Sequence, residues 1–270
     1  MNSFIWNADP VLLSFSFIQI RWYGLMFALA FLTGFWIMRR TYIKEGLPVE
    51  NLDPLFIHMI VGTIIGARLG HCFFYNPGYY LSHPMEIIAV WQGGLASHGG
   101  GIGIFISLWF YHKKYKRPYL EILDQLSIPT ALGGCFIRLG NFFNSEILGK
   151  ASNAPWAVVF KRFDDVPRHP AQLYESMAYL CIALILTGVY ISFRGWYRKG
   201  GLFGLFLFLV FTARLLIEFM KEGQAAYAID SILNTGQVLS IPFILCGIIL
   251  IFRSLLPLKV RIYERQKPDL

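Results

Sequence analysis

The most informative part of this chain reads Gly133-Gly134-Cys135-Phe136-Ile137-Arg138-Leu139-Gly140-Asn141-Phe142-Phe143-Asn144-Ser145-Glu146. Arg138 lies near the end of an apolar run that begins before this stretch. A guanidinium inside or at the edge of hydrocarbon is costly without a partner, so such a residue is a functional-site hypothesis by default. An arginine that snorkels to the interface is the alternative. Two amides and a carboxylate follow within about two helical turns, and they favour a polar site at a membrane edge.

Seven apolar runs along the chain are each close to the roughly 20 residues that a bilayer requires. They cover 16–38, 55–75, 97–112, 122–140, 173–193, 201–219 and 237–257. Soluble domains carry about 25% charged residues, whereas this chain of 270 residues carries 15% and is 56% hydrophobic. The sequence therefore predicts an all-α polytopic membrane protein with about seven spans in a single domain, 1–270. Residues 141–171, between the fourth and fifth spans, are expected to form a small outer (periplasmic) element.

The net charge of +8 is distributed in a way that argues against nucleic-acid binding. Basic residues gather in alternate loops and in the C-terminal tail: Arg39, Arg40, Lys44, Lys113, Lys114, Lys116, Arg117, Arg194, Arg198, Lys199, Arg253, Lys259, Arg261, Arg265 and Lys267. This is the positive-inside pattern, which predicts a cytoplasmic C-terminus and, with seven spans, an N-terminus outside. Residues 141–171 are the exception, with Lys150, Lys161, Arg162 and Arg168. The N-terminus lacks a basic region, so the first apolar run is expected to stay as a span rather than be cleaved.

A set of nine polar residues within or beside the predicted spans maps to their outer halves under this topology. They are Arg21, Tyr23, Arg68, His98, Arg138, Asn141, Arg214, Glu218 and Gln237. The orientation came from charges in the loops alone, so their convergence is independent support for one shared site. The four cysteines lie within apolar runs at no metal-binding spacing. Neither a metal nor a cofactor is expected.

Two arginines on different predicted spans, Arg138 and Arg214, suit a phospholipid head group. The planar guanidinium donates to phosphate in a bidentate way. Glu218 lies four residues after Arg214, on the same helical face. A salt bridge that neutralises both charges and a direct ligand role are both open. The two are compatible, because a carboxylate can orient a guanidinium that binds phosphate.

Glycines mark two further features of the predicted spans. Gly62, Gly66 and Gly70 repeat every four residues, which lets helices approach closely. The run 99–101 weakens a helix, and we expect irregular backbone lining a cavity there. His98 precedes this run, so we expect a catalytic or substrate-contacting histidine. A structural histidine is the alternative.

Four motifs, spread over most of the chain in a consistent order, resemble the prolipoprotein diacylglyceryl transferase family. They are Trp22-Tyr23-Gly24-Leu25-Met26, Gly93-Gly94-Leu95-Ala96-Ser97-His98-Gly99-Gly100, the run from Arg138 to Glu146 with Gly149 beyond it, and His169-Pro170-Ala171-Gln172-Leu173-Tyr174-Glu175. The resemblance implies an enzyme of the bacterial cytoplasmic (inner) membrane. Its implied reaction moves diacylglyceryl from phosphatidylglycerol to the lipobox cysteine in the signal peptide of a prolipoprotein. The resemblance also implies that the enzyme contacts membrane lipids.

The resemblance and the polar pattern together give the expected site. The expected catalytic residues are His98 as the proton acceptor, with Arg138 and Arg214 on the phosphate. The expected substrate-binding residues are Arg138, Tyr23, Asn141, Asn144, Glu146, Gly149, Glu218 and Arg68. Some family members carry a tyrosine one turn before the arginine that Arg214 matches, and this chain has Val210 there. A proton-handling role for that tyrosine is therefore not carried over.

Two other classes of membrane protein compete with this interpretation. An intramembrane protease needs a Ser/His dyad on separate spans or paired aspartates, but Ser97 and His98 are adjacent and Asp124 is the one aspartate expected in a span. A transporter usually shows two halves with corresponding broken helices. The sequence has no internal repeat, and its polar groups gather at one face.

Overall fold

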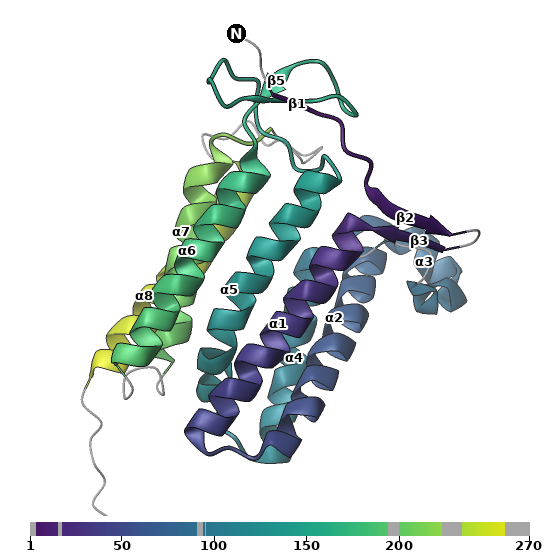
Figure 1. Ribbon diagram of the computed structural model, residues 1–270. Helices are drawn as coiled ribbons and strands as arrows, with labels where there is room; N and C mark the ends of the chain where they lie inside the picture. Colours follow the sequence, from purple (N-terminus) through teal and green to yellow (C-terminus); the bar gives the residue numbers. More distant parts are fainter. Residues whose placement is uncertain are drawn as a thin grey trace, which may run out of the picture.

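The computed structural model describes residues 4–15, 18–90, 94, 96–193, 200–222 and 234–256. Within these residues, seven long helices run side by side (Figure 1). They are α1 (Trp22–Glu45), α2 (Leu52–Tyr75), α4 (Ser97–Tyr115), α5 (Tyr119–Phe143), α6 (Ala171–Ser192), α7 (Gly201–Glu218) and α8 (Thr235–Leu255). In the described part of the chain, five segments are long and apolar enough to cross a membrane: 22–45, 49–75, 171–192, 201–218 and 236–255. They correspond to α1, α2 with the three residues before it, α6, α7 and α8. The protein is therefore a polytopic membrane protein. Membrane crossing by α4 and α5 stays a prediction.

The predicted start of the first span is wrong. Residues 18–21 form a strand, β3 (Ile18–Arg21), which pairs with β2 (Val11–Phe15) in an antiparallel hairpin, and α1 begins only at Trp22. Residues 18–21 alternate apolar and polar side chains, and this period of two favours a strand over a helix. The helix then continues through the basic residues to Glu45, where Gly46 ends it in the left-handed conformation, φ 67°.

The helices pack as close pairs. α2 lies against α4, α7 against α8, and α5 lies between α1 and α6. The α2–α4 pair meets at glycines: a Cβ added at Gly66 would lie 2.7 Å from the Cα of Gly103. The expectation of irregular backbone at 99–101 is wrong, because α4 is helical from Ser97 onward. Gly99 instead faces Gly66 and Gly70, so this glycine serves close packing of two helices.

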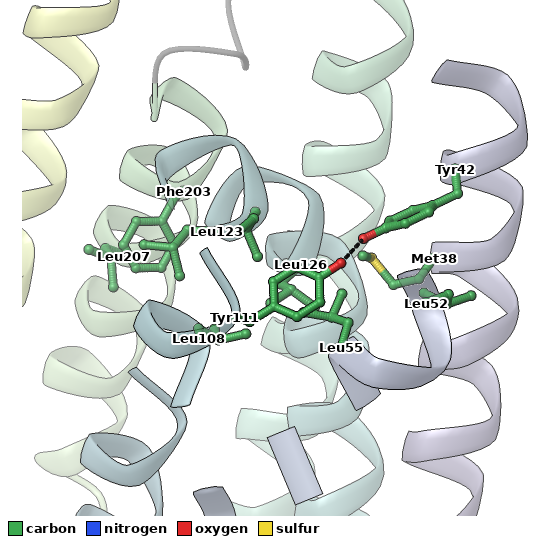
Figure 2. Packing of buried hydrophobic residues seen from close by; sticks show 11 residues of the cluster. Met38, Tyr42, Leu52, Leu55, Leu108, Tyr111, Leu123, Leu126, Phe203 and Leu207 are labelled. Atoms are coloured by element: carbon green, nitrogen blue, oxygen red, sulfur yellow. Dashed lines mark hydrogen bonds between the residues drawn. The ribbon is translucent and has the colours of Figure 1, made fainter. Parts of the chain in front are cut away.

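A buried hydrophobic cluster joins α1, α2, α4, α5 and α7 (Figure 2). Tyr42 and Tyr111 meet at its polar edge, with their hydroxyl oxygens 3.4 Å apart, and Tyr111 also donates to the carbonyl of Asn51 at 2.9 Å. Both rings are fully buried, so these hydrogen bonds satisfy hydroxyls that would otherwise cost stability.

Asp124 on α5 is fully buried and binds the start of α7. Its carboxylate accepts hydrogen bonds from the backbone N–H groups of Gly200 and Phe203, both at 2.8 Å. The first N–H groups of a helix have no partner within it, and an acidic group there also meets the positive end of the helix dipole. The one aspartate expected in a span is thus a structural cap for α7.

A small sheet lies at the end of the bundle where α5 ends and α6 begins (Figure 1). It has the order β1-β4-β5, with β1 (Phe4–Trp6) parallel to β4 (Val158–Phe160) and β5 (Pro167–Arg168) antiparallel to β4. We call residues 4–6 and 144–170 the head. Trp6 packs on Phe142, and its indole N–H donates to the Phe142 carbonyl at 3.2 Å. The chain thus forms a folded element between α5 and α6, and the N-terminal strand belongs to it; its position outside the membrane stays a prediction. Two short helices, α3 (Pro77–Ser82) and the 3₁₀ helix η2 (Pro84–Ile88), follow α2, and a third, η1 (Val49–Asn51), precedes it.

Candidate active site

Arg138 lies on the last turns of α5 and is held by two neighbours. Its Nε is 2.8 Å from Oε2 of Glu175 on α6, and its Nη1 donates to Oδ1 of Asn141 at 3.1 Å. The side chain is only 13% exposed. A snorkelling arginine would extend to water, so the structure favours a fixed arginine in a polar site.

The turn after α5 continues this network. Glu146 accepts hydrogen bonds from Nδ2 of Asn141 at 2.9 Å and Nδ2 of Asn144 at 3.1 Å. Gln172 on α6 donates to the Glu146 carbonyl at 2.5 Å. Ser145 and Ile147 have positive φ values, 54° and 57°, in a region that non-glycine residues rarely adopt. The hydrogen bonds to Glu146 from both helices hold this unfavourable turn in place.

Glu175 is the buried centre of a chain of alternating charges. It is fully buried, and its second oxygen, Oε1, is 2.9 Å from Nζ of Lys221, which in turn is 3.1 Å from Oε2 of Glu218. Lys221 is 3% exposed. Sequence reasoning did not assign Glu175 or Lys221 to the site. The available signal was Glu175 itself, a carboxylate near the start of an apolar span.

Arg214 on α7 is half-buried, and among the described residues no carboxylate lies within ion-pair distance of it. The possible salt bridge between Arg214 and Glu218 is not formed. Glu218 pairs with Lys221 instead, and its carboxylate lies against Gly236 at the start of α8. Tyr179 on α6 lies close enough to Arg138 and Arg214 to interact with both charges. The two expected phosphate ligands therefore converge on one region between α5, α6 and α7.

Tyr23 belongs to the same region. It lies within electrostatic reach of Arg138 and Glu146, and its ring packs on Gly140, where an added Cβ would lie 2.9 Å from the ring. Gly149 is close by in sequence but packs against His169, and an added Cβ there would lie 2.6 Å from the His169 Cβ. Its tight packing gives Gly149 a structural reason to be glycine.

His98 and Arg68 lie on the α2–α4 pair, and no hydrogen bond, ion pair or ring contact joins either of them to Arg138 within the residues described. Arg68 is 3% exposed, and its guanidinium donates to the carbonyls of Ile87 at 3.0 Å, Glu86 at 2.6 Å and Gly94 at 3.4 Å. It thereby ties η2 and Gly94 to α2. His98 is exposed in the first turn of α4.

The arrangement is suited to bind an anion at the end of the bundle. Arg138 supplies a fixed guanidinium, and Arg214 supplies a half-buried cation without an acidic partner in the described structure. Such preorganised cations stabilise negative charge that develops on a leaving group. In the part of the chain that the structure describes, no three His, Cys, Asp or Glu side chains come together as metal ligands.

Comparison with known proteins gives one consistent result. The family model described as prolipoprotein diacylglyceryl transferase matches residues 10–253. A phosphatidylglycerol–prolipoprotein diacylglyceryl transferase of Tolumonas auensis is 49% identical over 250 residues, covering 92% of this chain and 96% of the relative. Proteins of the same name from Chloroherpeton thalassium and Bacteroides fragilis are 48% and 42% identical, with 92% of this chain covered by each and 93% and 94% of the relatives. With its paired Arg138 and its polar turn at Glu146, the chain belongs to the prolipoprotein diacylglyceryl transferase family.

Proposed function

We propose that this protein transfers the diacylglyceryl group of phosphatidylglycerol to a cysteine thiol of a prolipoprotein, the first step of bacterial lipoprotein maturation. The names of the relatives state this reaction for those proteins. The observation that carries it to this chain is the convergence of Arg138, held by Glu175, and Arg214, which lacks an acidic partner among the described residues.

The two arginines would bind the phosphate of phosphatidylglycerol. The sulfur of the cysteine thiolate attacks the glyceryl carbon that bears the phosphate ester, and a carbon–sulfur bond forms as the carbon–oxygen bond breaks. The electron pair leaves with glycerol phosphate, which gains negative charge. Arg138 and Arg214 would stabilise that charge, and a guanidinium whose orientation is already fixed needs little reorganisation at the moment of reaction.

The thiol proton must also be removed, since the thiolate is the nucleophile. His98 is the proposed proton acceptor. Its imidazole is exposed at the start of α4, on a different helix pair from Arg138. Catalytic hydrogen bonds often form only in the substrate complex, so the separation in the free protein is compatible with this role.

The remaining polar residues would position the substrate and the arginines. Asn141 and Glu146 orient Arg138 through its Nη1, and Asn144 fixes Glu146. Tyr23 lies beside the same two charges and is proposed to contact the head group. Gly149, Glu218 and Arg68 are proposed as supporting residues: Glu218 through Lys221, Gly149 through its packing on His169, and Arg68 through its hydrogen bonds to η2.

We further propose that the protein lies in the bacterial inner membrane with seven spans, its N-terminus outside and its C-terminus cytoplasmic. The head and the Arg138 site would then face outward, and the precursor would approach with its signal peptide in the membrane and its lipobox cysteine at the outer face. The positive-inside pattern of the loops supports this orientation.

The decisive experiment measures transfer of labelled diacylglyceryl from phosphatidylglycerol to a lipobox peptide by the purified protein. The expected result is a labelled thioether on the peptide cysteine and release of glycerol phosphate. A peptide with serine in place of the cysteine is the control. Cleavage of the peptide without transfer would overturn the proposal in favour of a protease. Lipid movement across vesicles without any covalent product would overturn it in favour of a transporter.

A further inference from the structure

We propose that Arg168, in the head, is a positioning residue for Arg138, acting through the segment that follows α7. This inference rests on the proposed function. Arg168 lies outside the charge network of Arg138, and it is 8% exposed. It belongs to an ion cluster of its own, which we call the Arg168 cluster: Asp164, Arg168 and Glu222.

The backbone just after α7 is bound to the head. Lys221 and Gly149 form an antiparallel bridge. The N–H of Lys150 donates to the Met220 carbonyl at 2.8 Å, and the N–H of Glu222 donates to the Leu148 carbonyl at 3.1 Å. The head and the end of α7 are therefore joined by strand-like hydrogen bonds.

Successive side chains on such an extended segment point to opposite sides. Lys221 points into the protein, where its Nζ contacts Glu175 and Glu218. Glu222 points toward the head, where its Oε2 is 2.6 Å from Nη1 of Arg168. One short segment thus carries both the inner partner of Glu175 and the outer partner of Arg168.

The contact between residues 148–150 of the head and residues 220–222 is called the joint below. The guanidinium of Arg168 binds three groups at this joint: Glu222, the carbonyl of Gly149 and Asp164. Nη1 donates to Glu222 and, at 3.3 Å, to the carbonyl of Gly149. Nε and Nη2 donate to the carboxylate of Asp164, with Nε 3.0 Å from Oδ2. This hydrogen bond from Arg168 lowers the pKa of Asp164 below its ordinary value, so Asp164 stays ionised near neutral pH.

The consequence is a connected path from the head to the site. Arg168 fixes Glu222, the backbone at 221–222 fixes Lys221, Lys221 shares the carboxylate of Glu175, and Glu175 orients Arg138. If the joint loosens, Lys221 leaves Glu175, and that carboxylate then pairs with Arg138 alone. A tighter and differently oriented pair would weaken the contact of Arg138 with a phosphate.

The test compares transfer rates of the full-length protein, in phosphatidylglycerol-containing detergent micelles, for Arg168→Lys and Glu222→Gln. A lysine ammonium cannot serve Asp164, Glu222 and Gly149 together, because it is a compact point donor rather than a planar fork. We expect kcat/KM to fall about tenfold for Arg168→Lys, the usual size for loss of a charge-assisted hydrogen bond, and less for Glu222→Gln. The matched control is Asp165→Asn, which breaks the exposed Lys161–Asp165 pair of the same head and should leave the rate within about twofold.

The readout that separates positioning from plain stability is a double-mutant cycle with Lys221→Met. Residues that act through one path are non-additive. Arg168→Lys should therefore change the rate by less than about twofold in the Lys221→Met background. Equal effects in both backgrounds would overturn the proposal, as would a rate loss that follows only the melting temperature. If Arg168→Lys does not fold, Glu222→Gln takes its place in the cycle with Lys221→Met, and the same two outcomes support or overturn the proposal. Transfer by the parent protein tests the proposed function independently.

Discussion

Glu175 holds Arg138 with one carboxylate oxygen, 2.8 Å from Nε, while its other oxygen binds Lys221 at 2.9 Å. A fully buried carboxylate is thus divided between two cations. Buried charges are tolerated when they are paired and hydrogen-bonded. Because the negative charge is shared, Arg138 is oriented by Glu175 without being fully neutralised. This is the condition that a phosphate-binding arginine requires.

Arg138→Lys is predicted to reduce transfer by at least about tenfold. Lysine keeps the charge but cannot contact Glu175, Asn141 and a phosphate from one planar group. A lost charge-assisted hydrogen bond costs about 1.5–3 kcal/mol, and about 1.4 kcal/mol is tenfold in rate. The measurement is transfer from phosphatidylglycerol at equal amounts of folded protein. Activity within twofold of the parent would make Arg138 a structural residue.

His98→Gln is predicted to leave the protein folded and able to bind phosphatidylglycerol, but to lose the chemical step. Glutamine can hydrogen-bond in place of the imidazole, yet it cannot take up a proton at physiological pH. Lipid binding and transfer should be measured on the same preparation, so that the two effects are separated. Near-parent transfer would exclude general-base catalysis and leave His98 with an orienting role.

Gly66→Ala is predicted to destabilise the protein by about 1–3 kcal/mol, the usual cost of overpacking a tight contact. An added Cβ would lie 2.7 Å from the Cα of Gly103 and closer still to the Gly99 carbonyl, and backbone cannot move aside as a flexible side chain can. Gly101→Ala is the matched control, because nothing lies within 4 Å of a Cβ there. Unfolding in detergent should show a lower melting temperature for Gly66→Ala alone. Equal melting temperatures would show that the α2–α4 contact is looser than described.

The Asp164–Arg168 pair is predicted to make stability depend on acid pH. The hydrogen bond from Arg168 lowers the pKa of Asp164 below its ordinary value of 3.8. A carboxyl whose pKa is lower in the folded state stabilises the fold above its unfolded pKa, and this contribution is lost as pH falls through the folded pKa. The parent should melt at a higher temperature than Asp164→Asn at about pH 7, and the difference should shrink below about pH 4. A difference that stays constant down to about pH 3 would contradict the assignment.

Reporter fusions are predicted to place Lys116 in the cytoplasm and Pro77 and Asp165 outside. The loop at Lys116 joins α4 to α5 and carries basic residues. Pro77 begins α3 and Asp165 lies in the head, and both are at the other end of the helices from Lys116. A cytoplasmic signal at Asp165 would put the Arg138 site on the inner face and contradict the proposed orientation.

Long, strongly apolar helices were predictable from the sequence, because each one is encoded by a continuous apolar run of about 20 residues. The ranges 201–219 and 173–193 differ from α7 and α6 by at most two residues at either end. The start of α1 was not predicted, because apolar content alone does not distinguish the alternating strand at 18–21 from a helix. The short elements at 77–88 were missed, since they are too short for either period to be visible.

The site was predictable where a polar residue interrupts an apolar run. Arg138 is of this kind, Asn141 and Glu146 directly follow the same run, and the structure brings the three into one network. Glu175 and Lys221 were not assigned, because a charge near the end of a span is ordinary at an interface and only the folded structure pairs them. The pairing of Arg214 with Glu218 was allowed by their spacing. Glu218 instead pairs with Lys221, because the bridge between Lys221 and Gly149 brings the Lys221 Nζ within 3.1 Å of the Glu218 carboxylate.

The parallel pairing of β1 with β4 has a consequence for biosynthesis. Phe4 pairs with Val158, so the first strand to be made cannot find its partner until more than half of the chain has been synthesised. In the proposed topology, four helices would enter the membrane while this strand waits outside. Contacts between residues so far apart in sequence are formed slowly. The β1–β4 pairing is therefore expected to form only after these four helices have been inserted.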